Sequence, residues 1–224
     1  MVSFCGRAFV ALISSSSLGF MCVGCGSASA DAAPTESCAS RFATSVESFV
    51  PGAGPSIGQA KLPDIVLGPP KGSGDGKGSL DVASLGNGGQ ITVGFAPSAI
   101  VDGPGPDFIV FENAFYVNDD PGQTFAELAT VEVSEDGVTF EPFPCTASEP
   151  PFGSCAGWHP VYANPDKNAI DPSDPALAGG DAFDLADLGV GNARYVRITD
   201  RVDLVGLNGI FDLDAVSIVN ASCR

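Results

Sequence analysis

"LATVEVSEDGVTFEPF", residues 128–143, decides the fold class that we predict for this chain. Two short runs rich in β-branched and aromatic residues, 128–134 and 138–143, meet at "SEDG" (134–137). Runs of this length and composition are typical of β-strands, and Asp-Gly between them is a tight-turn signal. The stretch therefore predicts two strands joined by a tight turn.

The rest of the chain repeats this pattern of short strands and turns. It holds 28 Gly and 18 Pro in 224 residues, and no segment longer than ten residues keeps the 3.6-residue period of a helix. Several short antiparallel strands with long loops predict an all-β fold, an antiparallel β-sandwich or jelly roll. The further strand predictions are 90–95, 107–115, 194–200 and 211–220.

The N-terminal residues are predicted to be a targeting signal and not part of the fold. Arg7 precedes a mostly apolar stretch, 8–24, which is too short for a comfortable membrane span. Cleavage before Cys25, as in bacterial lipoprotein signals, would leave a lipid on Cys25, whereas cleavage after "ASA" (28–30) would release the chain. We favour the lipoprotein interpretation because "GSASADAAPTES" (26–37) looks like the polar tether of such proteins.

The predicted organisation has three parts. Residues 1–24 are the signal peptide, 25–58 are the tether with an irregular lead-in, and 59–224 are a single β-sandwich domain. About 200 residues after processing are enough for one core and few for two. The domain is expected to lie outside the cytoplasm, on a lipid anchor or secreted.

The charge of the chain limits its partners. Acidic residues outnumber basic ones 27 to 10, which gives a formal net charge of −17. Nucleic acid or an anionic membrane surface would therefore be repelled at long range. We expect cations as natural partners, and contact with a membrane only through the N-terminal lipid.

Four cysteines remain beyond the signal region, an even number in an oxidising compartment. Three pairings are possible. The most natural one joins Cys145 to Cys155 across a short loop and Cys38 to Cys223 near the two ends of the domain. A zinc site made by all four is disfavoured because the sequence lacks C-x-x-C pairs.

Two sets of motifs carry a family resemblance. "VEVSEDGVTFEPF" (131–143) with "ARYVRITD" (193–200) resembles the discoidin-like, or coagulation factor type C, domains of the galactose-binding-like superfamily. "DGPGPDFIVFENAF" (102–115) and "GIFDLDAVSIVN" (209–220) are similar to motifs of uncharacterised secreted bacterial cell-surface proteins. "LGNGGQITVGF" and "DPALAGGDAFDLADLG" are shared with the same proteins.

The resemblance implies a galactose-binding-like sandwich whose loops bind a glycan or a cell-surface partner. The chain departs from the discoidin pattern in one place. About fifty residues separate "SEDGVTFEPF" from "ARYVRI", which is longer than usual, and this insertion holds both loop cysteines, the one Trp and the one His. Sugar-contacting residues of discoidin domains therefore cannot be carried over to this insertion.

Several carboxylates stand inside segments that otherwise look like sheet core. In a strand over 211–220, Asp212 and Asp214 share a face with Val216 and Ile218, and the opposite face is apolar too. A carboxylate removed from water costs several kcal/mol unless it is protonated, paired or bound to a metal. A compensating partner is therefore expected.

Calcium is the partner that we favour. Arg residues or backbone N–H groups are alternatives, but removal of Arg7 with the signal leaves nine basic residues for 27 acidic ones. Ca²⁺ takes six to eight oxygen ligands and is abundant outside the cell. Galactose-binding-like domains often hold a structural Ca²⁺ beside the final strand. The predicted ligands are Asp214, Glu112, Asp184 and Asp212.

"GWHPVYANP" (157–165) offers Trp158 and Tyr162 as candidate glycan-contacting residues, since flat aromatic faces in loops often hold sugars. The alternative is that Trp158 packs beneath the loop closed by the disulfide. His159 is expected to be a hydrogen-bonded loop residue.

The resulting prediction is a non-catalytic binding module for a glycan or a surface partner. A structural or adhesive protein with no small ligand is the main alternative. A hydrolase is less favoured, because "GPSIG" (54–58) lacks the strand and helix that surround a nucleophile elbow, and a carboxylate pair such as Asp184 with Asp187 would need a cleft.

Overall fold

The computed structural model describes residues 40–203 and 209–223. The predicted signal peptide, the predicted lipidation of Cys25 and the Cys38 end of the predicted Cys38–Cys223 pair lie outside these residues and stay predictions. No helix in the described part of the chain is long and apolar enough to span a bilayer.

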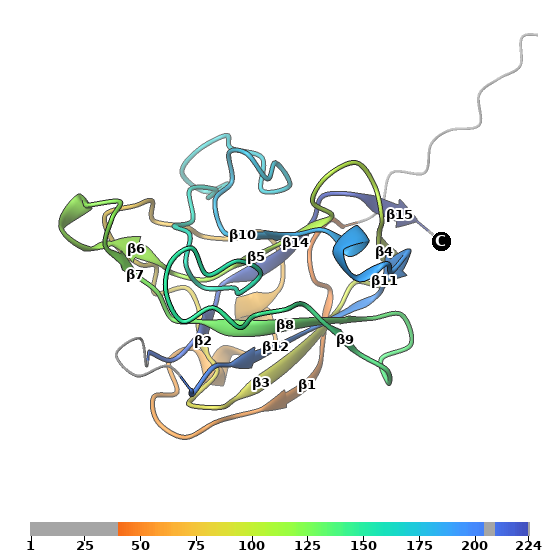
Figure 1. Cartoon of the computed structure of the whole chain (residues 1–224), viewed down its shortest axis with the longest axis horizontal. Helices are drawn as coiled ribbons and strands as arrows, with labels where there is room; N and C mark the ends of the chain where they lie inside the picture. The colour runs from red at the N-terminus through yellow and green to blue at the C-terminus, as the bar shows by residue number, and fades with distance from the viewer. Residues whose placement is uncertain (1–39, 204–208, 224) are drawn as a thin grey trace, which may run out of the picture. The chain divides into compact units, whose positions relative to one another are not determined.

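The first strand predicted from 128–143 is observed, and the second is shortened from 138–143 to 141–142. The two strands pair at one edge of a five-stranded antiparallel sheet, and residues 135–140 connect them in place of the predicted tight turn (Figure 1). Val131 and Val133 are buried and stand opposite Ile198 and Val196 on the neighbouring strand. This alternation is what the strand period requires, because every second side chain faces the core. The sheet order is β1 (Ser45–Val50), β3 (Gln90–Gly94), β12 (Tyr195–Asp200), β8 (Ala129–Ser134) and β9 (Glu141–Pro142).

A second antiparallel sheet covers the inner face of the first (Figure 1). It consists of β10 (Asp181–Phe183), β5 (Phe108–Phe111) and β14 (Ala215–Ile218). Phe108 and Val216 from this sheet share one apolar core with Val131 and Ile198 from the other. The predicted all-β antiparallel sandwich is therefore confirmed, whereas the galactose-binding-like jelly roll stays a prediction.

Both faces of β5 and β14 are buried. On the outer face, Ile109 and Phe111 pack against Val161, Ala163 and Ala178. The last three belong to the segment between β9 and β10, which makes up most of the insertion predicted from the sequence. The insertion therefore covers the outer face of the second sheet, and acidic residues at the ends of β5 and β14 lie in dry surroundings.

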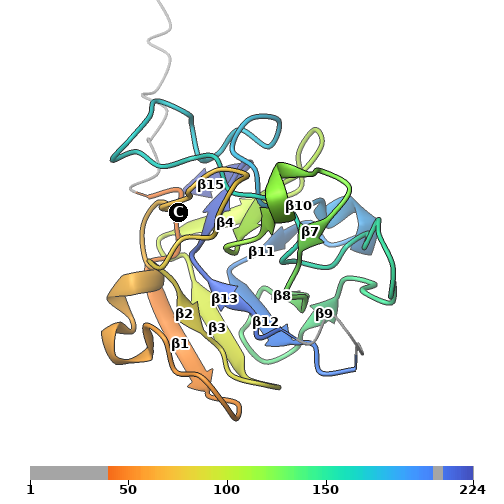
Figure 2. The same cartoon turned by 90° about the vertical axis from the view of Figure 1, so that its left-hand side faces the viewer.

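Shorter elements complete the described fold. Figures 1 and 2 show three of the short strands side by side, and these pair as β11–β4–β15. All described helices are 3-10 helices of three or four residues. The elements are β2 (Ala83–Ser84), β4 (Ser98–Val101), β6 (Phe115–Tyr116), β7 (Thr124–Phe125), β11 (Asn192–Ala193), β13 (Asp212–Leu213), β15 (Ala221–Cys223), η1 (Gln59–Lys61), η2 (Asp64–Val66), η3 (Val117–Asp119) and η4 (Leu185–Leu188).

The predicted boundary between the tether and the domain is wrong. Residues 25–58 were expected to be irregular, yet β1 pairs with β3 from Ser45 opposite Gly94 to Val50 opposite Gln90. This edge strand escaped prediction because its residues are half-buried or exposed, so "SVESFV" carries no continuous apolar run. The sandwich therefore begins well before residue 59.

The predicted disulfide between Cys145 and Cys155 is confirmed, with the two Cα atoms 4.7 Å apart. It closes the loop that follows β9. The loop packs on a small apolar cluster that includes Leu128 and Phe152. The bond therefore closes this loop, and the apolar cluster holds the loop against the segment that leads into β8.

Candidate functional site

The four predicted calcium ligands do not converge on one point. They divide among three places: Glu112 lies near Asp212, Asp214 lies beside the backbone N–H of Lys71, and Asp184 lies in a separate acidic cluster. Among the described residues, no three of the four bring carboxylate oxygens within 4.8 Å of one another. The predicted four-acid site is therefore wrong, because the loops that carry these residues enter the core at different points.

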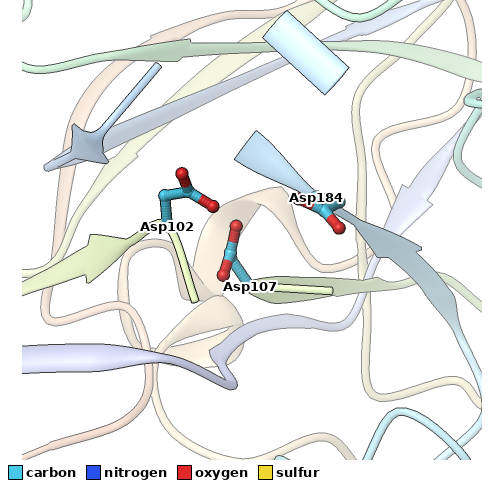
Figure 3. Close-up of side chains that lie close together, drawn as sticks. All are labelled: Asp102, Asp107 and Asp184. Atoms are coloured by element: carbon cyan, nitrogen blue, oxygen red, sulfur yellow. The ribbon is translucent and has the colours of Figure 1, made fainter. Parts of the chain in front are cut away.

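Asp184 forms a cluster with Asp102 and Asp107, and one carboxylate oxygen of each lies within 4.8 Å of the others (Figure 3). We call these three residues the Asp184 cluster. Asp184 itself caps η4, since its Oδ1 accepts a hydrogen bond from the Ala186 N–H at 2.9 Å. Asp102 is exposed. The cluster thus joins the loop before β5 to the segment after β10.

Asp107 is fully buried and fully satisfied. Its Oδ1 accepts hydrogen bonds from the Gly103 N–H at 2.9 Å and from the Asn220 side-chain amide at 2.8 Å. Its Oδ2 accepts one from the Leu185 N–H at 2.8 Å. Three donors in three separate segments therefore compensate this carboxylate, as the backbone alternative from the sequence supposes, and the geometry indicates a structural role.

Glu112 presents the opposite situation. It follows β5 and is 1% exposed, and neither of its carboxylate oxygens has a hydrogen-bond partner. Burial, and then the nearby Glu127, raise the pKa of Glu112 well above its usual range, while Asp212 and Asp181 add to the rise and the Asn113 backbone N–H opposes it. Glu112 is therefore an uncompensated buried acid.

The neighbours of Glu112 are further acidic residues, which add negative charge to an already uncompensated site. We name Glu112, Glu127 and Asp212 the Glu112 cluster. Burial, with the charge of Asp212, raises the pKa of Glu127 to about 7, although the Ile210 N–H donates to Oε1 at 3.2 Å. Burial also raises the pKa of Asp212, which accepts a long hydrogen bond from the Asn113 side chain. Within the described chain, no Lys or Arg contributes to these shifts.

Asp181, which lies near the Glu112 cluster, is better compensated. It accepts hydrogen bonds from the N–H groups of Gly157 at 2.6 Å and Trp158 at 3.2 Å, and its Oδ1 lies 2.7 Å from His159 Nδ1. Burial still raises the pKa of Asp181, although these three groups oppose the rise. His159 is thus the hydrogen-bonded loop residue that the sequence predicts.

A groove opens on the side of the fold that carries η1 and η2. Its first hollow has a volume of about 430 Å³ and its second about 440 Å³, and both are lined by Lys71 and Asp81. We call the two hollows together the Lys71 groove. The first hollow offers apolar and charged groups side by side, from Lys61, Asp64, Ile65, Leu67 and Asp214.

Lys71 lies where the two hollows meet. Its Nζ is 3.1 Å from Asp81 and 3.6 Å from Asp166, and its backbone N–H donates to both carboxylate oxygens of Asp214, at 2.9 and 3.1 Å. Burial, with a smaller contribution from Asp81, raises the pKa of Asp214 to about 8. Asp214, predicted as a calcium ligand, therefore forms part of the groove wall.

This shift predicts that Asp214 makes stability depend on pH. At low pH Asp214 is protonated in both the folded and the unfolded chain. As pH rises, Asp214 ionises first in the unfolded chain, so the free energy of unfolding falls until the pH passes about 8. In metal-free buffer, Asp214→Asn is expected to reduce the fall of the free energy of unfolding between pH 5 and 7 by up to about 1.4 kcal/mol per pH unit. Urea unfolding across this pH range measures the free energy, and the same pH dependence in the variant and the wild type would contradict a raised pKa of Asp214.

Of the two aromatic residues that were predicted to contact glycan, Trp158 has a structural role. Its Nε1 donates to the Cys155 carbonyl at 3.0 Å, and its ring meets Phe152 edge to face at 5.7 Å. It therefore packs beneath the loop closed by the disulfide, as the alternative supposes. Tyr162 is 36% exposed and lies outside the residues that line the groove.

Sequence reasoning missed the Lys71 groove and Glu127. The groove had a sequence signal: the chain contains four lysines, at 61, 71, 77 and 167, and all four line its two hollows. Glu127 carried no such signal, because its position near Glu112 depends on how the segment before β8 packs against the end of β5.

Comparison with known proteins gives few matches. No protein-family model and no curated protein matches the sequence. Among solved structures, the chain is similar to the C-terminal domain of a chitobiase from Bacteroides fragilis, with 14% identity, a TM-score of 0.31 and coverage of 61% of this chain and 64% of that one. It is also similar to a glycoside hydrolase, with 15% identity, a TM-score of 0.30 and coverage of 79% of this chain and 30% of that one. The chain thus spans less than two thirds of either.

Proposed function

We propose that this chain is a non-catalytic binding module, displayed outside the cytoplasm, whose Lys71 groove binds a glycan. The single observation that carries the proposal is the composition of the first hollow, where carboxyl groups, the two ammonium groups of Lys61 and Lys71, and apolar side chains line a volume of about 430 Å³. This volume lies in the range of small-molecule sites, roughly 300–1,000 Å³. Anchoring through Cys25 belongs to the same proposal, and a Cys25→Ala chain that stayed in the membrane fraction would contradict it.

The groove has the chemistry that sugar recognition needs. Sugar hydroxyl groups donate hydrogen bonds to carboxylates and accept them from ammonium groups, while the C–H faces of the ring pack on apolar surface such as Ile65 and Leu67. Lys71 is held by Asp81 and Asp166, so its donors are fixed before a ligand arrives. Such preorganisation reduces the entropy lost on binding.

Asp81→Ala is expected to weaken glycan binding about tenfold or more, because it removes a charged acceptor and releases Lys71; a hydrogen bond to a charged group contributes about 1.5–3 kcal/mol. A glycan array identifies the ligand and calorimetry measures the affinity. Asp187→Ala is the matched control, since Asp187 is exposed on η4 away from the groove.

Other outcomes separate the alternatives. Loss of binding in Tyr162→Ala with unchanged binding in Asp81→Ala would place the glycan on the aromatic loop instead. An array with no reproducible ligand would favour a structural or adhesive protein. Cleavage of a bound glycan would favour a hydrolase.

We also propose that the Glu112 cluster holds a structural Ca²⁺. The supporting observation is that both Glu112 oxygens are buried and lack hydrogen-bond partners beside Glu127 and Asp212. The available donors are oxygens, as Ca²⁺ requires, and main-chain carbonyls or water would complete the shell because the carboxylates are more widely spaced than in the Asp184 cluster. Titration of the metal-stripped chain with Ca²⁺ tests binding. The Asp184 cluster is a poorer candidate because its buried member, Asp107, is already satisfied.

A further inference from the structure

All four lysines of this chain line the Lys71 groove. Lys61 and Lys71 belong to the first hollow, and Lys71, Lys77 and Lys167 belong to the second. The chain as a whole has a formal net charge of −17. Every ammonium side chain is therefore gathered around one concave surface of a strongly acidic protein.

The two hollows differ in charge. Acidic residues outnumber lysines in the first, where Lys61 and Lys71 face Asp64, Asp81 and Asp214. Lysines outnumber acidic residues in the second, where Lys71, Lys77 and Lys167 face Asp81 and Asp166. The second hollow is therefore the part of the groove that favours an anion.

Ion pairing leaves two lysines of the second hollow available. Asp81 and Asp166 both pair with Lys71, at 3.1 and 3.6 Å. Lys77 and Lys167 are exposed and make no ion pair with any residue that the structure describes. Their ammonium groups can therefore be desolvated by a ligand without first breaking an internal pair.

The loop that carries Lys167 is fastened to the segment that carries Lys71. The Asn164 side-chain amide donates to the Gly72 carbonyl at 2.8 Å, and the Lys167 N–H donates to the Asn164 carbonyl at 2.8 Å. Asn164 is buried, so this link is shielded from water. The position of Lys167 along the rim is therefore set by the fold.

We propose that the second hollow binds an anionic substituent, a carboxylate or a sulfate, of a glycan whose neutral part occupies the first hollow. This inference rests on the proposed function of the same groove and names its ligand class. The many acids elsewhere on the chain do not prevent it, because the Debye length is about 8 Å at physiological salt and contacts between ligand and ammonium groups are far shorter. Charge-assisted hydrogen bonds from Lys77 and Lys167 supply the preference for the anion.

The test compares an acidic oligosaccharide with its uncharged methyl ester. Calorimetry measures the binding of oligogalacturonate, of the methyl ester of the same oligomer, and of a sulfated oligosaccharide to the full chain. We expect the acidic oligomer to bind at least tenfold more tightly than the methyl ester, and this difference to shrink as NaCl is raised. The sulfated arm decides whether the site takes carboxylate, sulfate or both.

Paired variants locate the effect. Lys77→Ala combined with Lys167→Ala is expected to abolish the preference for the acid, because binding of the acid falls to the level of the methyl ester. Lys61→Ala is the control in the first hollow, compared with Lys77→Ala and Lys167→Ala taken singly: it removes one lysine charge, as each of these does, and should preserve the preference. Equal affinity of the wild type for acid and methyl ester would overturn the inference and leave the proposed function standing, whereas no binding of any saccharide would remove both.

Discussion

In saturating Ca²⁺, the wild-type chain is expected to melt about 5–10 °C above the metal-stripped chain, and Glu112→Gln is expected to abolish this difference. A ligand at one hundred times its Kd adds about 2.7 kcal/mol to the free energy of unfolding, and 1 kcal/mol corresponds to about 2–4 °C for a domain of this size. Glu112 is decisive because both of its oxygens are buried and available. Differential scanning calorimetry with and without chelator measures both values.

Without Ca²⁺, the Glu112→Gln variant is expected to be no less stable than the wild type. Without the ion, wild-type Glu112 either keeps its proton or bears an unpaired buried charge, and burial beside Glu127 opposes ionisation. Glutamine has no charge, so metal-free Glu112→Gln should be at least as stable as the metal-free wild type near pH 7. One substitution thus removes the gain from Ca²⁺ while it leaves or improves basal stability.

Asp184→Asn is the matched control for this experiment. Asp184 belongs to the other acidic cluster, and its Oδ1 bond to the Ala186 N–H can be kept by an Asn oxygen. The variant should therefore retain the full Ca²⁺ response. If Asp184→Asn lost the response and Glu112→Gln kept it, the ion would lie in the Asp184 cluster and the proposal would fail.

The strands that could be predicted from the sequence are those whose own pattern of apolar and polar residues indicates which side chains are buried. The runs that became β8 and β12 carry β-branched residues in the alternation of a half-buried strand, and the run that became β3 is a short β-branched run whose two faces are both buried, so local chemistry was sufficient. β1 and β10 were missed because each is defined by its pairing partner, β3 or β5, and not by an apolar run of its own. Pairing between distant segments is a property of the assembled fold.

The burial of the interior acids was predictable from the sequence, and their partners were not. Dry surroundings for Glu112, Asp212 and Asp214 followed from their apolar neighbours in sequence, and all three are buried. Their compensation did not follow, because it depends on which loops meet. Asp214 met the backbone of Lys71, 143 positions away, whereas Glu112 met other acids.

Asp107→Ala is expected to lower the free energy of unfolding by about 3–5 kcal/mol, the largest loss that we predict for a single polar side chain here. The substitution removes the acceptor of three donors. The buried Leu185 N–H and the half-buried Gly103 N–H lose their partner, and the half-buried Asn220 amide keeps only a longer hydrogen bond to the Pro106 carbonyl, at 3.3 Å. Each buried group left unsatisfied costs about 1–3 kcal/mol, although relaxation and entry of water offset part of the sum. Urea denaturation followed by tryptophan fluorescence measures the loss.

Asp107→Asn separates hydrogen bonding from charge. Asparagine keeps one acceptor oxygen but presents an amide where the other carboxylate oxygen accepts, so it should lose less stability than alanine and more than a conservative surface change. A result for Asp107→Ala within 1 kcal/mol of the wild type would contradict the structural role. Asp107 and Glu112 are both buried carboxylates on either side of β5, yet the first has three donors and the second has none. Removal of their charges should therefore change metal-free stability in different directions, because the partner of a buried acid, and not its burial, sets the sign.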